Sequence, residues 1–312
     1  MMGEACGANH QDEQVVAVGR GISLAYEEIG AEDGEPLLLV AGLGQQLHSW
    51  PDAFCEVLAE RGYRVVRFDN RDVGRSTHED FRPAKFASML VGRFPVGQYD
   101  LVDLAEDTVG LLDALGIEST HVVGVSMGGM IAQTVAARHP DRVRTLTSIM
   151  STTGARRIGR PALSTLRLMG AAPPKTREAA IQRALMMFRH IGSHGFPMDE
   201  EWVSARAGRG WDRDPSSAGT GRQLGAIMKS GDRTPSLRSV AAPTLVIHGD
   251  RDRMVHPTGG AATVRAITGA RLETITGMGH DLPKAAWPRL LDLIDDHARV
   301  TRSADARDTT AS

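Results

Sequence analysis

The chain has 312 residues, of which 41% are hydrophobic and 24% charged; these fractions are typical of a globular protein and exclude disorder along the whole chain. Lysine and arginine number 36 against 38 aspartate and glutamate, so no excess charge favours nucleic acid or an acidic membrane surface as a partner. No stretch approaches the roughly 18 apolar residues of a membrane-spanning helix, and the amino terminus lacks the basic and apolar regions of a secretory signal. We therefore expect a cytoplasmic protein that neither spans a membrane nor binds nucleic acid.

Strand-like and helix-like segments alternate along most of the chain. The first two strands are expected to form a hairpin that turns at Gly19–Gly21, and the later strands are solid apolar runs, as in sheets covered on both faces. Pro51 and Gly62 mark the start and stop of a first helix. The other predicted elements are strands at Gln14–Val18, Ile22–Ile29, Leu37–Ala41, Val65–Phe68, His121–Val125, Thr145–Met150, Thr244–His248 and Leu272–Ile275, and helices at Leu101–Leu115, Met127–Ala137 and Ala285–His297. This order predicts an α/β fold with a mostly parallel sheet that helices cover on both faces.

The alternation is interrupted between about residues 154 and 238, which hold helical pieces and no strand pattern. An insertion of this size between two sheet strands predicts a helical cap over the carboxyl edge of the sheet, where such sheets bind ligands. The predicted domains are a core of residues 14–153 and 239–299, a cap of residues 154–238, and flexible polar tails at residues 1–13 and 300–312.

The strongest local pattern is Gly124-Val125-Ser126-Met127-Gly128, which lies between a predicted strand and a predicted helix. A nucleophilic serine at such a turn has a strained backbone, and the positions two before and two after it must be nearly bare. The helix amino terminus adds free N–H groups beside the serine. Because glycine is frequent in this chain, the flanking strand and helix carry the assignment of Ser126 as a nucleophile.

A serine hydroxyl needs a base to take its proton and a carboxylate to orient that base. Asp250 and Asp252 both follow the strand Thr244–His248, and His280 lies in a glycine-rich turn after the strand Leu272–Ile275. The order of serine, acid and histidine is the one found in hydrolases built on a strand–serine–helix turn.

With these motifs, the chain resembles the α/β-hydrolase-fold enzymes over residues 14–298, and among them it is similar to the actinobacterial esterases that include aclacinomycin methylesterase. The residues that carry the resemblance are Ala41-Gly42-Leu43-Gly44, Asp69–Ser76, Gly124–Gly129, Gly249–Pro257 and Gly277–Pro283. The resemblance implies a sheet of the α/β-hydrolase type with a helical cap inserted late in the sheet.

The resemblance also implies roles for single residues. Ser126 is the nucleophile, His280 the general base and then acid, and Asp252, rather than Asp250, the carboxylate that orients the histidine. The oxyanion hole is formed by the backbone N–H groups of Met127 and Leu43. The chain departs from the family in having Ala41 where a histidine usually begins the turn that contains Leu43. No cofactor and no metal are implied.

The expected function is hydrolysis of a small, apolar carboxylic ester through an acyl-enzyme intermediate on Ser126. Two alternatives remain: a cofactor-free perhydrolase or haloperoxidase that uses the same three residues, and a ligand-sensing homologue that hardly turns over. The physiological ester and the oligomeric state are left open by the sequence.

Two further segments have a structural and a functional interpretation. The turn Asp69–Ser76 is expected to be a salt-bridged structural turn, although its charged side chains could touch a substrate. Gln45 and Gln46 are expected in a solvated loop, although they could offer polar contacts at the mouth of the pocket.

Methionine and aromatic residues of the cap are expected to pack mainly on one another and on the core, with about a third at the pocket. They are Met169, Met186, Met187, Phe188, Phe196, Met198, Trp202, Trp211 and Met228.

Overall fold

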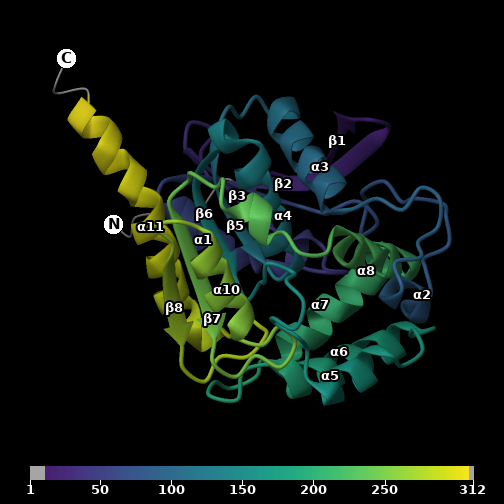
Figure 1. Cartoon of the computed structure of the whole chain (residues 1–312). Helices are drawn as coiled ribbons and strands as arrows, with labels where there is room; N and C mark the ends of the chain where they lie inside the picture. The colour runs from purple at the N-terminus through teal and green to yellow at the C-terminus, as the bar shows by residue number, and fades with distance from the viewer. Residues whose placement is uncertain (1–10, 309–312) are drawn as a thin grey trace, which may run out of the picture.

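A computed structural model describes the backbone of residues 11–308 and the side chains of residues 11–300. Eight strands form a single sheet in the order β1-β2-β4-β3-β5-β6-β7-β8 (Figure 1). The strands are β1 (Gln14–Gly19), β2 (Ile22–Ile29), β3 (Glu35–Val40), β4 (Tyr63–Phe68), β5 (Thr120–Val125), β6 (Val143–Ile149), β7 (Thr244–Gly249) and β8 (Arg271–Ile275). β2 pairs antiparallel with β1 and β4, and all other neighbours pair parallel. The mostly parallel α/β fold predicted from the sequence is confirmed.

Helices cover the two faces of this sheet and create two apolar cores. Helices α1 (Asp52–Glu60) and α11 (Trp287–Asp308) pack on one face, and α3 (Leu101–Ala114), α4 (Met127–Arg138) and α10 (Thr258–Ala266) pack on the other. Successive side chains of a strand point to opposite faces. In β3, for example, Leu37 and Leu39 belong to the α1 and α11 core, whereas Leu38 and Val40 belong to the α3 and α4 core.

Local sequence signals account for where several of these helices begin and end. α3 starts at a capping box in which Asp100 accepts a hydrogen bond and Asp103 bonds back to the backbone of Asp100, which satisfies N–H groups that have no partner within the helix. It ends before Gly116, whose φ of +65° is favourable for glycine.

Between β6 and β7 lie five helices and, in this described segment, no strand. They are α5 (Leu163–Met169), α6 (Arg177–Ile191), α7 (Glu200–Arg213), α8 (Ala218–Ser230) and α9 (Thr234–Leu237). α5 to α8 gather on one side of the molecule next to the short helix α2 (Phe86–Leu90) (Figure 1). Of these helices, α8 contacts the flanking helix α3. The boundaries 154 and 238 for a separate cap remain a prediction.

Of the two expected tails, the structure describes residues 11–13 and the backbone of residues 300–308. Residues 1–10 lie outside the described residues, but the Gln11 N–H donates to Glu28 O at 3.0 Å, and Glu13 pairs with Arg213 at 2.8 Å. α11 continues to Asp308 instead of ending near His297. The physical reason is that no glycine or proline follows Pro288 before the helix ends, so nothing in the backbone stops the helix.

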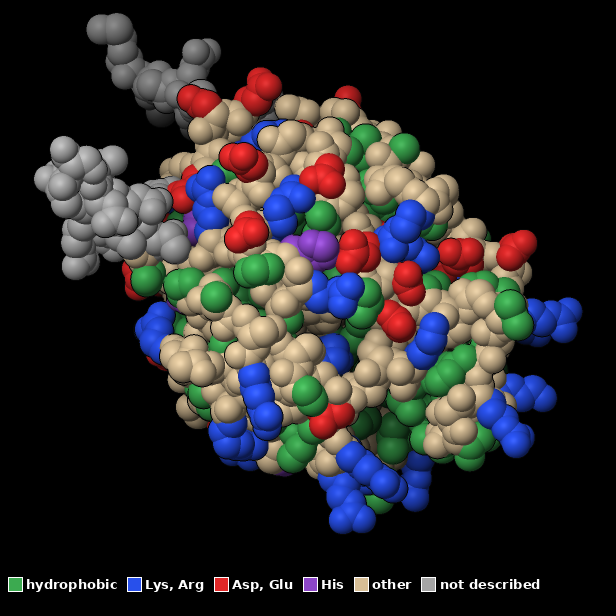
Figure 2. All heavy atoms as spheres, turned by 45° about the horizontal axis from the view of Figure 1, so that its top comes forward, with side chains coloured by type: hydrophobic (Ala, Val, Ile, Leu, Met, Phe, Trp, Pro, Cys, Tyr) green, Lys and Arg blue, Asp and Glu red, His purple; other side chains and the backbone are tan. Residues whose placement is uncertain are grey.

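No helix of the described part of the chain is both long and apolar enough to span a membrane. On the face seen in Figure 2, acidic and basic side chains are interspersed over the upper part, while lysine and arginine side chains project along the lower and right margins.

Candidate active site

Ser126 sits at the sharp turn between β5 and α4, with φ of +56° and ψ of −117°. Such a backbone is strained for a residue with a side chain, and it persists only where the surroundings enforce it. Tight backbone packing at Gly124 and Gly128 enforces this conformation of Ser126. A Cβ on Gly124 would lie 2.2 Å from Gly128 O, and one on Gly128 would lie 2.1 Å from Val40 O. The motif is therefore required by close backbone contacts between β5, α4 and the end of β3.

The structure brings Ser126, His280 and Asp252 into one hydrogen-bonded chain. His280 Nε2 lies 3.0 Å from Ser126 Oγ, and His280 Nδ1 lies 2.7 Å from Asp252 Oδ2. The three residues follow β5, β8 and β7, and the carboxyl ends of parallel strands meet at the same edge of the sheet. Residues up to 154 positions apart thus meet at one point.

Asp252 is fully enclosed and anchored to its own loop. Its Oδ1 accepts hydrogen bonds from the N–H groups of Met254 and Val255, both at 2.8 Å, and His248 Nε2 lies 3.4 Å from its Oδ2. Burial alone would raise the pKa of Asp252, but His280, His248 and the Val255 N–H favour the carboxylate and hold the pKa well below its usual range. The side chain is therefore an anion at neutral pH.

Asp250, the other acid in this loop, points elsewhere. It is exposed, and its Oδ1 accepts a hydrogen bond from the Gly277 N–H at 2.7 Å. Both residues lie in the turn after β7, where the two-residue repeat that places alternate side chains on one side of a strand does not hold. The sequence alone therefore could not choose between them.

The loop that carries His280 is held by the carboxyl end of α6 and the residues that follow it. The His280 N–H donates to Ile191 O at 2.7 Å, at the carboxyl end of α6. A Cβ on Gly279 would lie 2.3 Å from Gly192 O, so only glycine allows this approach. Ser193 Oγ accepts from the Gly279 N–H at 2.9 Å. The end of α6 therefore fixes the position of the histidine loop.

The turn after β3 lies directly beside Ser126. A Cβ on Gly42 would be 3.5 Å from Ser126 Cβ. Among the described residues, the N–H groups of Leu43 and Met127 donate no hydrogen bond. Two unpaired N–H groups next to a nucleophile are suited to stabilise a developing oxyanion.

A residue that the sequence analysis did not single out supports this turn. Gln223, fully buried on α8, accepts from the Gly44 N–H at 2.8 Å and donates to Arg71 O at 2.8 Å. Asn70 Nδ2 also donates to Ala41 O at 3.2 Å. These amides support the turn in which Ala41 replaces the histidine usual in related enzymes. Because Gln223 is 179 residues from Gly44, no local pattern could identify it.

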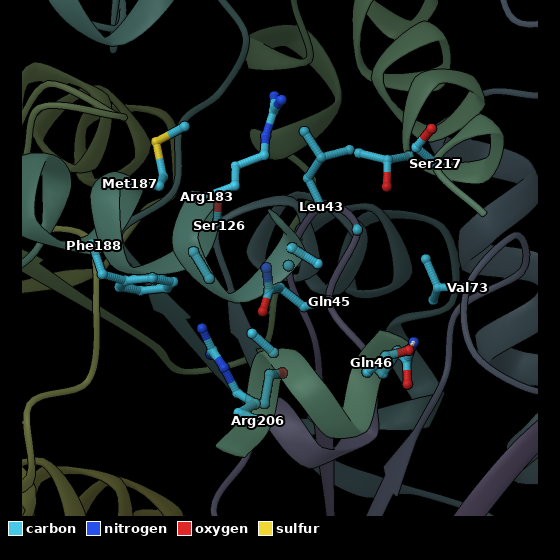
Figure 3. Close-up of a pocket in the computed structure, with 18 of the residues that line it drawn as sticks. Leu43, Gln45, Gln46, Val73, Ser126, Arg183, Met187, Phe188, Arg206 and Ser217 are labelled. Carbon is cyan, nitrogen blue, oxygen red and sulfur yellow. Dashed lines mark hydrogen bonds between the residues drawn. The ribbon is translucent and has the colours of Figure 1, made fainter. Parts of the chain in front are cut away.

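Ser126 and His280 open into a cavity of about 620 Å³ between the sheet edge and helices α5 to α8. Figure 3 shows Met187 and Phe188 of α6, Arg206 of α7 and Leu43 around Ser126. Five of the nine cap methionine and aromatic residues line this cavity, more than the third expected from the sequence; they are Met169, Met187, Phe188, Trp202 and Trp211.

Gln46 differs from its expected place in a solvated loop. It lines the cavity and ties it to α7, because its Nε2 donates to Gly210 O at 2.9 Å and its Oε1 accepts from Arg213 Nη1 at 2.5 Å. Arg213 in turn pairs at 2.7 Å with Asp69, which has no exposed surface. The polar side chain of Gln46 thus joins the loop after β3 to α7, and the spacing of residues in the sequence does not indicate this contact.

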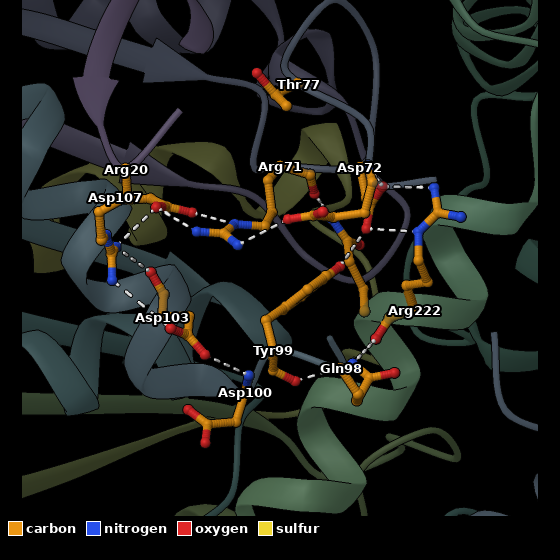
Figure 4. Close-up of polar contacts among 12 residues, drawn as sticks. Arg20, Arg71, Asp72, Thr77, Gln98, Tyr99, Asp100, Asp103, Asp107 and Arg222 are labelled. Carbon is orange, nitrogen blue, oxygen red and sulfur yellow. Dashed lines mark hydrogen bonds and ion pairs between the residues drawn. The ribbon is translucent and has the colours of Figure 1, made fainter. Parts of the chain in front are cut away.

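The turn Asp69–Ser76 is a buried network of ion pairs and hydrogen bonds (Figure 4). Arg71 makes two hydrogen bonds to Asp107, at 2.5 and 2.6 Å, and Arg222 makes two to Asp72, at 2.9 and 2.6 Å. Tyr99 Oη donates to Asp72 Oδ2 at 2.7 Å. Arg71 and Asp72 are thus engaged by protein groups, and the Asp72–Arg222 pair joins α8 to the core.

We expect Asp72→Asn to lower the free energy of unfolding by about 3–5 kcal/mol, because it leaves the buried guanidinium of Arg222 without its counter-charge. Asparagine tolerates the φ of +74° found at this position, so backbone strain does not contribute. Asp113→Asn removes the partner of Arg142 at an exposed pair and should cost less than about 1 kcal/mol. Urea unfolding of both variants measures this difference; equal costs would contradict the structural role of the turn.

In the part of the chain with described side chains, no group of three or more His, Cys, Asp or Glu residues is arranged to hold a metal ion.

A family model described as the alpha/beta hydrolase fold matches residues 35–283. Rhodomycin D methylesterase DauP of a Streptomyces strain is 29% identical over 304 residues, covering 89% of this chain and 96% of that protein. The crystal structure of a hydrolase from Pseudomonas aeruginosa is similar with a TM-score of 0.67 and 25% identity, covering 93% of this chain and 98% of that one. An esterase structure from Rhodococcus has a TM-score of 0.71 at 19% identity, covers 91% of this chain and 98% of its own, and supports the fold alone.

Proposed function

Because this chain belongs to the alpha/beta hydrolase fold family, we propose that it is a serine esterase that cleaves a carboxylic ester through an acyl-enzyme intermediate. The observation that carries the proposal is the hydrogen-bonded chain from Ser126 through His280 to Asp252 at the wall of a 620 Å³ cavity. The similarity to a methylesterase over most of both chains supports an ester as the substrate.

The first half of the reaction acylates the serine. His280 Nε2 takes the proton of Ser126 Oγ as the oxygen attacks the ester carbonyl carbon, and the carbonyl oxygen becomes an oxyanion. The N–H groups of Leu43 and Met127 stabilise that charge. When the tetrahedral intermediate collapses, His280 gives its proton to the departing alkoxide, and the alcohol leaves.

The second half returns the enzyme to its starting state. His280 takes a proton from a water molecule, whose oxygen attacks the acyl carbon on Ser126. The second intermediate collapses, the proton passes to Ser126 Oγ, and the carboxylic acid leaves. Asp252 remains ionised throughout; it fixes Nδ1 as the protonated nitrogen and stabilises the imidazolium that forms twice in each cycle.

A panel of methyl and p-nitrophenyl esters graded by acyl size tests this function. Steady, Ser126-dependent release of alcohol supports it. A single-turnover burst with retained ligand binding would instead favour a ligand-sensing homologue, and faster perhydrolysis than hydrolysis of one acetate ester in the presence of peroxide would favour a perhydrolase.

The support of the oxyanion turn by Gln223 predicts an effect on rate. Gln223→Leu keeps the side-chain volume but removes the acceptor for the Gly44 N–H, so the turn can shift away from Ser126. We expect kcat to fall by up to about 10²-fold with little change in KM, because the oxyanion exists only in the transition state. Steady-state kinetics on one good ester measures both constants. A raised KM with unchanged kcat would show that Gln223 shapes the pocket instead.

A further inference from the structure

One positively charged side chain that lines the cavity, Arg206, forms no ion pair with a described residue. Arg206 extends from α7 into the cavity, toward Phe188 (Figure 3). Among the described residues, its guanidinium donates no hydrogen bond and has no carboxylate within 4.0 Å. Other partly or fully buried arginines of this chain are engaged: Arg71 by Asp107, Arg213 by Asp69 and Arg222 by Asp72. Arg233, which is buried without a carboxylate partner, still donates through Nη2 to Gln133 Oε1 and Thr152 O. Arg206 differs from all four in making no hydrogen bond to a described residue.

Two aromatic rings hold the Arg206 guanidinium in place without using its donors. Its Cζ lies 4.6 Å from the ring centroid of Phe188 and 4.5 Å from that of Trp202. The attraction of a cation to the faces of aromatic rings compensates part of the cost of removing it from water. The N–H groups point outward in the plane of the guanidinium, so they remain available to a ligand.

The charge of Arg206 is kept in this environment. Burial lowers its pKa to about 10, while the charge of Asp281 acts in the opposite direction, so the side chain is cationic at neutral pH. Asp281 lines the same cavity but is committed elsewhere, because its Oδ1 accepts a hydrogen bond from Ser193 Oγ at 2.6 Å.

The other arginine that lines the cavity, Arg183, already uses its guanidinium in hydrogen bonds within the protein. Arg183 donates to the carbonyl oxygens of Ala171 and Ala172 at 3.0 and 2.6 Å. Its guanidinium thus closes the loop after α5. Of the two arginines that line this cavity, Arg206 is the one whose guanidinium makes no hydrogen bond to a described residue.

We propose that Arg206 binds a carboxylate of the substrate, so that the physiological substrate is an ester whose apolar body also carries a free carboxylate. This inference rests on the proposed esterase function and narrows its substrate class. A planar guanidinium with two free parallel N–H groups matches a carboxylate by a pair of hydrogen bonds. The methionine and aromatic side chains around it accommodate the apolar body, and anchoring the carboxylate at Arg206 presents the ester carbonyl to Ser126.

Monomethyl dicarboxylates test the proposal when compared with their dimethyl esters, from glutarate to suberate. Both series contain a methyl ester, but only the first carries a carboxylate. We expect kcat/KM to favour the monomethyl ester at one chain length. Arg206→Met should lower kcat/KM for that compound by about 10- to 100-fold, the usual effect of losing charge-assisted hydrogen bonds, and leave the dimethyl ester nearly unaffected. Methionine keeps the apolar stem against Trp202, and retained dimethyl ester cleavage shows that the variant is folded.

Arg209→Met is the matched control, because Arg209 lies on the same helix but outside the cavity, with half of its side chain exposed. It should not change the preference. Equal losses for both esters in Arg206→Met, or no preference for the monomethyl ester at any length in the unsubstituted protein, would overturn the proposal.

A binding measurement separates this proposal from the esterase function itself. Calorimetric titration of Ser126→Ala with each monomethyl ester of the series, which does not depend on cleavage, should show binding at one chain length that is weakened about 10- to 100-fold when Arg206→Met is added. If that binding is found but the unsubstituted protein cleaves no ester, the esterase function fails while the carboxylate site stands. If esters are cleaved and binding is insensitive to Arg206→Met, the carboxylate site fails alone.

Discussion

Ser126→Ala is expected to lower ester turnover by roughly 10⁴- to 10⁶-fold, the range found when a serine nucleophile that works with a histidine is removed. Without Oγ no acyl-enzyme can form, and His280 loses the group whose proton it takes at 3.0 Å. The remaining rate reflects only the oxyanion donors and the positioning of substrate. Steady-state hydrolysis of the best ester in the panel, with active-site titration of the unsubstituted protein, gives the ratio.

Ser217→Ala is a suitable control for this loss. Ser217 lines the same cavity at the start of α8, and its side chain makes no capping hydrogen bond to the helix. The Ser217→Ala variant should hydrolyse ester at close to the rate of the unsubstituted protein. Ser126→Ala should also unfold at an unchanged or slightly higher temperature, because alanine fits the same turn. Residual turnover in Ser126→Ala within tenfold of the unsubstituted protein would sink the nucleophile assignment.

Asp252→Asn is expected to lower kcat by about 10⁴-fold, whereas Asp250→Asn should have a small effect. Asparagine at position 252 has no second oxygen to accept the hydrogen bond that His280 Nδ1 makes at 2.7 Å. The imidazole then carries its proton on Nε2, which must be free to take the proton of Ser126. In addition, the imidazolium that forms during the reaction loses its buried counter-charge. Asp250 is exposed, and its bond from the Gly277 N–H can equally be accepted by an asparagine oxygen. Parallel kinetics on the two variants measures the contrast.

The fold of Asp252→Asn should persist, because the side-chain oxygen can still accept from the Met254 and Val255 N–H groups. Thermal unfolding followed by circular dichroism checks this point. Should Asp250→Asn be the inactive variant and Asp252→Asn the active one, the orienting carboxylate must be reassigned.

Asp250 and Asp252 also show which features of the site could not be predicted from local sequence patterns. Spacing after β7 left both open, and only the resemblance to a family favoured Asp252. The hydrogen bond to His280 depends on how the β7 and β8 loops meet, 28 residues apart. The same limit applies to Glu13, because its ion pair with Arg213 depends on a helix 200 residues away.

The sequence by itself determined the eight strands in chain order, four of the five helices that flank the sheet, and the turn at Ser126; α10, which also packs on the sheet, was not predicted. The predicted features follow from short-range physics: the period of apolar residues sets the type of element, and contacts of bare backbone at Gly124 and Gly128 require glycine. The family of the chain was readable for the same reason, because its motifs are local.

Tertiary structure alone decided which polar side chains enter the cavity and which remain unpaired there. Nothing in the spacing of 36 lysines and arginines distinguishes Arg206 from Arg222, yet one meets two aromatic rings and the other a buried carboxylate. The cause is that the groups that pair with a charge, or leave it unpaired, are brought to it from distant parts of the chain by folding. The burial that makes an unpaired charge costly exists only once α5 to α8 have packed against the sheet edge.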